Sequence, residues 1–450
     1  MKKYLVLTLA TMLIAPAIAR AQSDAERIRD LEQAVESLAK KEKERAAAEE
    51  KTKKLKGTPL RPVSNKGKLE WTSDDKATSF RLTGRAQIDG ALFSGDENNN
   101  GDALGLRRGR LGFKARVAND WTAEFVIDFA GNATDIKDAY VGYEGFKNTA
   151  IQFGQFKTPF GYDALVSSKD IWFIERAYID TFAPGRRLGL GYFYGADRYS
   201  ASAALFTQEI GEDVSGLDQG WGWAVRGTWA PIMRSSTRAV HIGAAAISWQ
   251  PDAAVDGSGT KPPPAYVVEF SSRPEVSKIA KAKYLNTGDL KETDHVEVYG
   301  LEFAGVWNAI AWQSEYQKAT VDRRASAFNL RDHDFDGWYG QVAYLFNGKR
   351  EYAADEGLVD RVEPEKKGAW EIALRYSTMD LNDLTPVDPI KGGSATNFTI
   401  GLNYYPTYNI RVMLNWTAVD NDEYAKPKKL YGAIPGDDFN VLQLRVQFAF

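Results

Sequence analysis

Apolar and polar side chains alternate along much of this chain from Ser79 onward. In the last such segment, residues 440–450, one face carries Leu442, Leu444, Val446, Phe448 and Phe450. Successive side chains of a strand point to opposite faces, so the segment reads as a strand with one apolar face. About ten residues are what a tilted strand needs to cross a bilayer, and an aromatic residue fits the membrane surface. The pattern predicts a strand of an outer-membrane β-barrel.

The same alternation predicts sixteen strands, an even number, as bacterial barrels require. They are 79–92, 106–117, 121–129, 135–143, 150–157, 188–194, 199–207, 221–229, 239–249, 296–307, 310–320, 337–346, 369–377, 397–405, 410–419 and 440–450. A further candidate, Ala265 to Phe270, would make the number odd. Short connections at 118–120, 145–148, 195–197 and 406–408 are expected on the periplasmic side, and that alternation puts Ala265 to Phe270 inside one long outer loop, 250–295. We expect the last strand to pair with the one that begins at Ser79.

Two other connections are unusually long. The loop from Thr158 to Arg187 carries Lys169, Arg176, Arg186 and Arg187 together with Trp172, Phe173 and Phe182. Folding inward would bury these rings and narrow the lumen, and loops of this size are usually functional. The segment from Asn347 to Gly368 falls on the periplasmic side, and alternation offers no account of its length.

The N-terminal 78 residues have a different pattern. Residues 1–21 read as a signal peptide, with Lys2 and Lys3 before an apolar run and a small-residue cleavage site at Ala21. Residues 22–57 are predicted to be a periplasmic helix, with Ile28, Leu31, Val35 and Leu38 at heptad spacing. Two interpretations stay open: a solvated charged helix, or a short coiled coil that joins identical subunits. Residues 58–78 are expected to be a linker before the barrel, 79–450.

Composition changes the picture in three ways. The chain has 21 Tyr, 22 Phe and 12 Trp, yet its mean hydropathy of -0.40 is too low for a helical membrane protein. A barrel reconciles the two, because half of each strand faces the lumen. The absence of cysteine excludes disulfides and thiolate metal sites. A net charge of -3 does not favour a nucleic acid partner.

The predicted lumen faces are rich in charge. They carry the cations Arg81, Arg85, Arg108, Arg110, Lys114, Arg116, Arg226, Arg375, Arg411 and Arg445, and the acids Asp89, Glu124, Asp128, Asp138, Glu302, Glu315 and Glu371. Six of these cations lie on the first two strands and form a basic strip. Such a strip would concentrate anions in a confined channel. The alternative is that these cations pair with acids on the next strand, such as Glu124 and Asp128, and only brace the wall; it applies most to Lys114 and Arg116.

Enzymatic motifs are weak. His241, His295 and His333 lie far apart and lack metal-ligand spacing. The cluster 331–336 (Arg-Asp-His-Asp-Phe-Asp) reads as a solvated acidic loop, and Asp96 to Gly101 as a turn. A barrel hydrolase would need a serine and a histidine paired near the lipid edge, and the sequence suggests none. We therefore predict no catalytic step, no cofactor and no metal.

Several motifs of the first third resemble the phosphate-selective porin O and P family. They are Phe80 to Asp89 (FRLTGRAQID), Leu106 to Gly112 (LRRGRLG), Asn119 to Trp121, Asp138 to Tyr143 (DAYVGY), Gly154 to Gly161 (GQFKTPFG) and Glu175-Arg176. The resemblance implies a homotrimeric sixteen-stranded porin with a periplasmic N-terminal segment and inward-folded loops. It also implies that the outer-membrane assembly machinery reads Phe450.

The resemblance extends to single positions. Arg85, Arg107 and Arg108 match the family's basic strip, and Asp138 matches its pore aspartate. Strict alternation puts Arg107 on the face opposite Arg108, so it needs a bulge to point inward.

The family's pattern also fails in two places. The resemblance implies a ladder of arginines, partly on the long loop after the ninth strand, and a lysine at the constriction near which phosphate binds. Here the loop Pro264 to Arg273 offers one arginine, Arg273, and the position of the constriction lysine aligns with Ala164 unless Lys157 or Lys169 replaces it.

From these observations we expect an outer-membrane porin for passive diffusion of inorganic anions or small polar solutes, surrounded by outer-membrane lipid. Arg85, Arg107, Arg108 and Arg110 would attract anions, and the loop around Arg176 would form the constriction. Two alternatives remain open. One is a general or cation-tolerant nutrient porin, and the other is a structural barrel that its N-terminal helix tethers to the cell wall.

Overall fold

A computed structural model describes residues 24–55, 59–65, 67–131, 134–211, 219–251, 253–254, 265–279, 282–324, 330–428 and 432–450. The chain divides into two compact units, 1–59 and 60–450. The predicted signal peptide, 1–21, lies outside the described residues. The described part of the first unit is one helix, α1 (Asp24–Leu55), which confirms the predicted helix. Its heptad side chains, Ile28, Leu31, Val35 and Leu38, are all more than half exposed.

None of the described helices combines the length and the apolar character needed to span a membrane.

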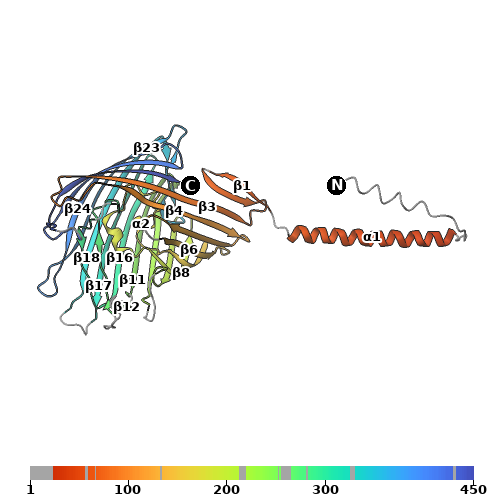
Figure 1. Cartoon of the computed structure of the whole chain (residues 1–450), viewed down its shortest axis with the longest axis horizontal. Coiled ribbons are helices and arrows are strands. Elements are labelled where there is room, and N and C mark those ends of the chain that lie inside the picture. Colours follow the sequence, from red (N-terminus) through yellow and green to blue (C-terminus); the bar gives the residue numbers. More distant parts are fainter. Residues whose placement is uncertain are drawn as a thin grey trace. The chain divides into compact units, whose positions relative to one another are not determined.

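The second unit is a closed antiparallel barrel, in which sixteen of the described strands form the ring (Figure 1). They are β3 (Ser79–Ser94), β4 (Ala103–Val117), β5 (Trp121–Asp128), β6 (Asp135–Tyr143), β7 (Thr149–Lys157), β8 (Arg186–Gly195), β9 (Tyr199–Phe206), β10 (Gly222–Ser235), β11 (Arg238–Trp249), β16 (Thr293–Trp307), β17 (Ile310–Arg323), β18 (His333–Phe346), β23 (Ala369–Asp383), β24 (Ile390–Tyr405), β25 (Ile410–Asn421) and β26 (Phe439–Ala449). The predicted number and order are confirmed.

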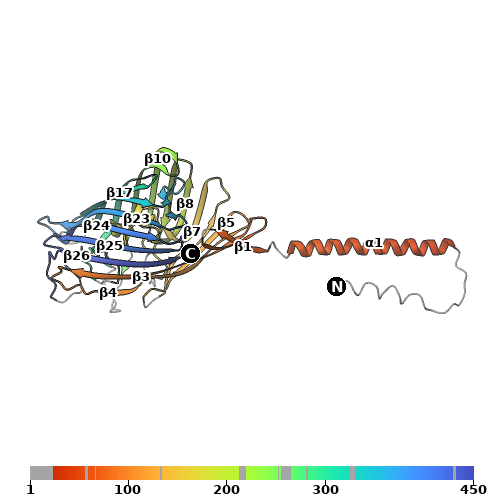
Figure 2. The same cartoon turned by 90° about the horizontal axis from the view of Figure 1, so that it is seen from above.

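The barrel closes as the alternation predicts. Strand β26 pairs with β3 from Asn440 opposite Ser94 to Ala449 opposite Arg85, and Figure 2 shows the two strands side by side. The pairing continues to Phe450, whose backbone N–H and C=O bond to those of Gly84 at 3.0 and 3.1 Å. Outward positions such as Leu444 and Phe448 are exposed, while inward Gln443 and Arg445 are buried. Side-chain parity therefore separates a lipid face from a polar interior.

The segment 58–78, which we expected to be a linker, contains a β-hairpin. Strands β1 (Leu60–Asn65) and β2 (Lys68–Ser73) pair with each other. Strand β2 also pairs with the first residues of β3, from Leu69 opposite Leu82 to Thr72 opposite Ser79. The hairpin thus continues the sheet along the edge of β3 beyond the point where β26 ends.

The buried core lies inside the barrel. The loop 158–185, which we expected to form the constriction and therefore call the constriction loop, carries α2 (Tyr162–Leu165) and a 3-10 turn, η1 (Tyr178–Phe182). In Figure 1 the segment with α2 lies among the barrel strands. Trp172, Phe173 and Phe182 are at most 4% exposed. They pack against inward-facing residues of the wall. The dense aromatic content of this loop is therefore buried inside the lumen.

The long loop between β11 and β16 stays out of the ring. Its described residues form only two-residue strands, which are β12 (Ala253–Ala254), β13 (Ala265–Tyr266), β14 (Ser271–Ser272) and β15 (Leu285–Asn286). The segment Ala265 to Phe270 is therefore no barrel strand, as the alternation required. Glu275 of this loop enters the lumen, where it accepts hydrogen bonds from the backbone of Tyr178 at 3.1 Å and from the Ser377 hydroxyl at 2.5 Å.

The segment 347–368 also folds into the lumen, and this inward path accounts for its unexpected length. It contains β19 (Gly348–Lys349), β20 (Tyr352–Ala353), β21 (Leu358–Val359) and β22 (Glu363–Pro364). The Tyr352 hydroxyl lies 2.8 Å from Nδ1 of His241 on the wall. The Val359 N–H donates to the hydroxyl of Tyr162 in the constriction loop at 3.0 Å. The segment therefore fills the lumen on the β10–β23 side and supports the constriction loop from the end with short turns.

Candidate pore site

Strand β4 turns two successive arginines toward the lumen. Its register against β3 shifts between Gln87 and Ile88, which pair with Arg108 and Leu106, so Arg107 is the extra residue of a β-bulge. A bulge re-aims side chains locally, and it gives Arg107 the inward direction that strict alternation denies it. The bulge that the family resemblance required is present.

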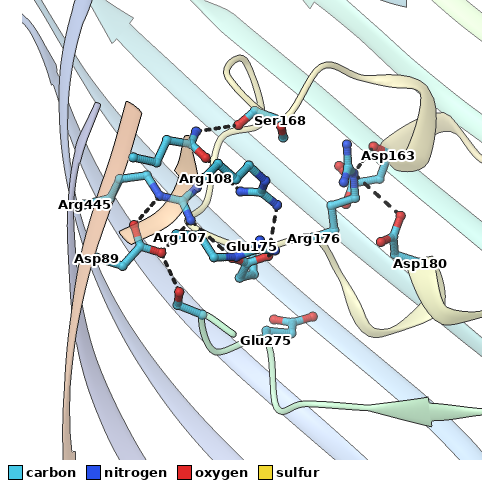
Figure 3. Close-up of polar contacts among 12 residues, drawn as sticks. Asp89, Arg107, Arg108, Asp163, Ser168, Glu175, Arg176, Asp180, Glu275 and Arg445 are labelled. Carbon is cyan, nitrogen blue, oxygen red and sulfur yellow. Dashed lines mark hydrogen bonds and ion pairs between the residues drawn. The ribbon is translucent and has the colours of Figure 1, made fainter. Parts of the chain in front are cut away.

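Three arginines of the barrel wall lie around the carboxylate of Glu175 in the constriction loop (Figure 3). Its carboxylate accepts two hydrogen bonds from Arg107, at 2.6 and 3.1 Å. Arg445 donates to it at 3.2 Å and Arg108 lies 3.6 Å away. Burial alone would raise the pKa of Glu175, but the three guanidinium groups outweigh burial and hold that pKa below its ordinary value. Glu175 therefore stays ionised and fastens the loop to the wall.

Most other cations of this part of the lumen are also paired. Arg110 donates to Asp128 at 2.8 Å, and Arg186 makes two bonds of 2.9 Å with Asp138. Nearer the short turns, Lys114 pairs with Glu124 at 2.7 Å and Arg116 pairs with Glu144 at 2.5 Å. Wall bracing is therefore wider than we expected, and it includes Arg107 and Arg110.

Two cations of the constriction loop region hold the loop's own backbone. The Lys157 ammonium donates to the carbonyl oxygens of Ala164, Leu165 and Val166 at 2.7, 2.9 and 3.1 Å. Arg176 donates to the carbonyl oxygens of Asp163 and Val166, both at 2.7 Å. An ammonium has three protons, so Lys157 has none left for a solute.

Arg85 and Lys169 differ from these cations. The one hydrogen bond of the Arg85 side chain among the described residues goes to the hydroxyl of Ser168 at 2.6 Å. The ammonium of Lys169, the residue after Ser168, makes no hydrogen bond or ion pair within the described part of the chain, and its electrostatic neighbours are Asp170, Arg85, Arg361 and Lys114. The pKa of Lys169 is lowered to about 8, chiefly by burial; Asp170 opposes this shift and the charge of Arg85 adds to it. Arg85 and Lys169 are thus less occupied by internal contacts than the other cations of this part of the lumen.

Arg85 and Lys169 line one cavity of about 470 Å³, which we call the main cavity. Among the described residues it is lined by eight cationic side chains and three side-chain carboxylates. The cations are Arg85, Arg108, Arg110, Lys114, Lys157, Lys169, Arg176 and Arg186, and the acids are Glu124, Asp138 and Asp180. This excess of positive charge makes the lumen electrostatically attractive to anions.

Two neighbouring cavities share residues with this one. On the side of the long loops, a smaller cavity is lined by Arg273 and Lys278 and shares Arg176 and Asp180 with the main cavity. Toward the short turns, a third cavity shares Lys114 and Glu124. The main cavity thus shares lining residues with both smaller cavities.

Of the predicted site residues, Arg107 and Arg187 do not line these three cavities. Arg187 donates from its guanidinium to the backbone carbonyl of Arg186 at 3.1 Å. Sequence reasoning missed the Ser168 hydroxyl, the role of Glu175 and the rings of Tyr140 and Phe193, which also line the main cavity. Tyr140 has the same strand parity as Asp138, so that signal was available, whereas loop contacts leave no periodic trace.

The acidic cluster 331–336 differs from the solvated loop that we expected. His333 is fully buried, and its two ring nitrogens lie 3.1 Å from carboxylates of Asp383 and Asp388. Arg331 pairs with Asp383. The cluster links the strands β18 and β23 at the long-loop end. No group of three or more His, Asp or Glu side chains among the described residues is arranged to hold a metal ion.

A closed sixteen-stranded barrel with an apolar outer face, a charged lumen and an inward constriction loop is the architecture of an outer-membrane porin, which is a channel. The sequence comparison agrees and is more specific. The sequence model of the family "phosphate-selective porin O and P" matches residues 80–450, and the chain belongs to this family.

Individual relatives are more distant. Porin O of Pseudomonas aeruginosa is 26% identical over 420 residues, which span 86% of this chain and 92% of that protein. Among solved structures, the trimer form of OmpT from Vibrio cholerae covers 83% of this chain and 100% of its own, with a TM-score of 0.51 and 13% identity. OmpF of Salmonella typhi, solved in complex with daunomycin, has a TM-score of 0.50, 13% identity and 83% coverage of this chain, against 98% of its own. These two structures support the fold.

Proposed function

We propose that this porin favours small anions of the phosphate class. The observation that carries the proposal is the charge around the main cavity, where eight cationic side chains face three side-chain carboxylates among the described residues. A narrow, low-dielectric passage with such an excess raises the local concentration of anions and lowers that of cations. The name of the family adds phosphate as the solute class.

Within the cavity, Arg85, Ser168 and Lys169 form the anion seat. Arg85 and Lys169 have no carboxylate partner within ion-pair distance in the described chain, so their charge is available to a solute. Arg107, Arg110 and Arg186 are held by Glu175, Asp128 and Asp138 and serve mainly to shape the wall. A guanidinium and an ammonium beside a hydroxyl can share the oxygens of one anion. Lys169, instead of Lys157, takes the place of the family's constriction lysine.

The three connected cavities define the path. A solute would enter beside Arg273 and Lys278, pass Arg176, which lines both cavities, and reach the anion seat. It would leave past Lys114, Arg116 and Arg81, where Glu70, Glu124 and Glu144 balance the charge. Attraction is thus strongest in the middle of the path and falls toward the exit, which lets a bound anion leave.

The orientation of the barrel and the role of α1 are also part of the proposal. Barrels of bacteria have short turns toward the periplasm, so we infer that segment 347–368 and the hairpin β1–β2 face the periplasm, and that the N-terminal segment with α1 is periplasmic as well. The exposed heptad positions of α1 suit a short coiled coil between identical subunits of a trimer.

Ion selectivity in planar bilayers tests the proposal. The full-length protein in a potassium chloride gradient should give a reversal potential of the sign for anion preference. The double variant Arg85→Ala, Lys169→Met should lose most of that preference at similar conductance. Lys366→Met is the matched control, because it removes one exposed positive charge outside the three cavities. Cation preference of the wild-type protein would refute the anion proposal, and a barrel without conductance would favour the structural tether.

A further inference from the structure

The main cavity has an aromatic side as well as a cationic one. Tyr140 of β6, Phe156 of β7 and Phe193 of β8 line the same cavity as Arg85 and Lys169. All three come from adjacent barrel strands at inward-facing positions, where the interior of a porin is ordinarily polar. A hydrated inorganic anion gains nothing from rings at these positions, so the aromatic side calls for a solute of another kind.

The rings are built into the wall in a defined arrangement. Phe156 and Phe193 meet edge to face, with centroids 5.8 Å apart at an angle of 80°. Gly191 lies between them, and a Cβ atom there would lie 2.7 Å from the Phe193 ring and 2.8 Å from the Phe156 ring. Only glycine therefore leaves both rings room. The Tyr140 hydroxyl donates to Glu124 at 2.8 Å, which orients the third ring.

The exposed fraction of each ring shows whether it packs in the apolar core or lines the cavity. Phe156 is 3% exposed and belongs to the apolar cluster that holds the constriction loop. Tyr140 and Phe193 lie at the edge of that cluster and are only partly buried. Phe156 is thus a packing residue, whereas Tyr140 and Phe193 present ring surface to the cavity.

We propose that the main cavity takes organic anions that carry an aromatic ring, with the anionic group at Arg85, Ser168 and Lys169 and the ring against Tyr140 and Phe193. This inference rests on the proposed anion path and narrows its solute class. Ring surface removed from water stabilises the bound solute, and ring pairs add a further favourable contact. A cavity of about 470 Å³ is of the size that holds small organic ligands, and this one offers aromatic rings beside its charged groups.

The experiment compares two anions of the same charge in planar bilayers with the full-length protein. Benzenesulfonate and methanesulfonate each carry one negative charge that does not depend on pH, and each is added as a blocker of the chloride current. We expect benzenesulfonate to reach half-block at a concentration about two- to tenfold lower. Phe193→Ser should abolish most of this difference, and Tyr140→Phe, which keeps the ring, should retain it.

The control variant is Tyr192→Ser, which removes a neighbouring ring of the same strand that faces outward and is 46% exposed. It should keep the wild-type ratio of half-blocking concentrations. Equal half-blocking concentrations of the two sulfonates in the wild-type protein would overturn the inference, and so would an unchanged ratio in Phe193→Ser. The reversal potential is measured in the same membranes, so a failure of the anion proposal shows separately as cation preference.

Discussion

Glu175 and Arg107, which are 68 residues apart in sequence, form a two-bond ion pair of 2.6 and 3.1 Å inside the barrel. Arg107 reaches Glu175 only because a bulge in β4 turns its side chain inward. Glu175 also meets Arg108 and Arg445, so one carboxylate of the constriction loop neutralises part of a three-arginine wall. The position of the loop and the charge of the pore are thus set by the same residue.

Replacing Glu175 by Gln should change both properties. The pore loses one negative charge, and Arg107 and Arg108 lose their carboxylate partner, whereas Arg445 keeps its two bonds of 2.7 Å to Asp89. The anion preference in a salt gradient should therefore increase. Breaking a buried ion pair should also lower stability by about 3 kcal/mol, measured as a shift in the urea midpoint of the folded barrel. Glu365→Gln, an exposed site, should change neither. An unchanged reversal potential for Glu175→Gln would mean that these arginines do not act on permeating ions.

Lys169 predicts a pH-dependent selectivity. Its pKa is lowered to about 8, chiefly by burial, and its charged neighbours are Asp170, Arg85, Arg361 and Lys114. A lysine with a lowered pKa is charged below that pKa and loses its charge as the pH rises through it. The anion preference should therefore fall between about pH 6.5 and about pH 9.5.

Two variants at position 169 check the assignment through the reversal potential measured over this range. Lys169→Arg stays charged at all these pH values and should keep the preference constant. Lys169→Met should show the low preference throughout. A wild-type fall that persists in Lys169→Met would assign the titration to another group.

The contact between Gly84 and Phe450, where β3 and β26 close the barrel, predicts a loss of stability. A Cβ atom at Gly84 would lie 2.4 Å from the ring of Phe450, which covers this glycine across the β3–β26 pair. Gly84→Leu should force the ring away and destabilise the barrel by about 1–3 kcal/mol, seen as a lower urea midpoint. Gly90→Ala on the same strand is the control, because its Cβ would meet only ordinary contacts at 3.7 Å or more. Equal midpoints for the two variants would show that the ring contact has no energetic role.

The inward segment 347–368 predicts a change in conductance. Replacing residues 350–365 by a short turn should empty the β10–β23 side of the lumen and raise the single-channel conductance. The milder variant Tyr352→Phe removes only the hydroxyl that lies 2.8 Å from His241. It should lower stability by about 1 kcal/mol and leave conductance unchanged. Unaltered conductance in the shortened protein would mean that the constriction loop alone limits the current.

Much of the fold could be predicted from the sequence because a barrel strand alternates between lipid and lumen. This parity predicts the sixteen strands, the closing pair of β3 and β26, and the exclusion of Ala265 to Phe270 from the ring. It also predicts which face carries Arg85, Arg110 and Asp138. The helix α1 follows from its own composition and spacing.

The alternation of side chains does not say which inward side chains find hydrogen-bond or ion-pair partners. The tertiary structure decided this pairing. Lys157 and Lys169 look equivalent in sequence, yet three backbone carbonyls take the protons of Lys157 and none takes those of Lys169 in the described chain. The hairpin β1–β2 and the inward path of segment 347–368 likewise depend on contacts with distant strands. The sequence by itself determined the barrel, because the bilayer imposes a local two-residue period. Only the folded chain decided which charges remain for a solute, because ion pairing inside the lumen joins residues that no local period connects.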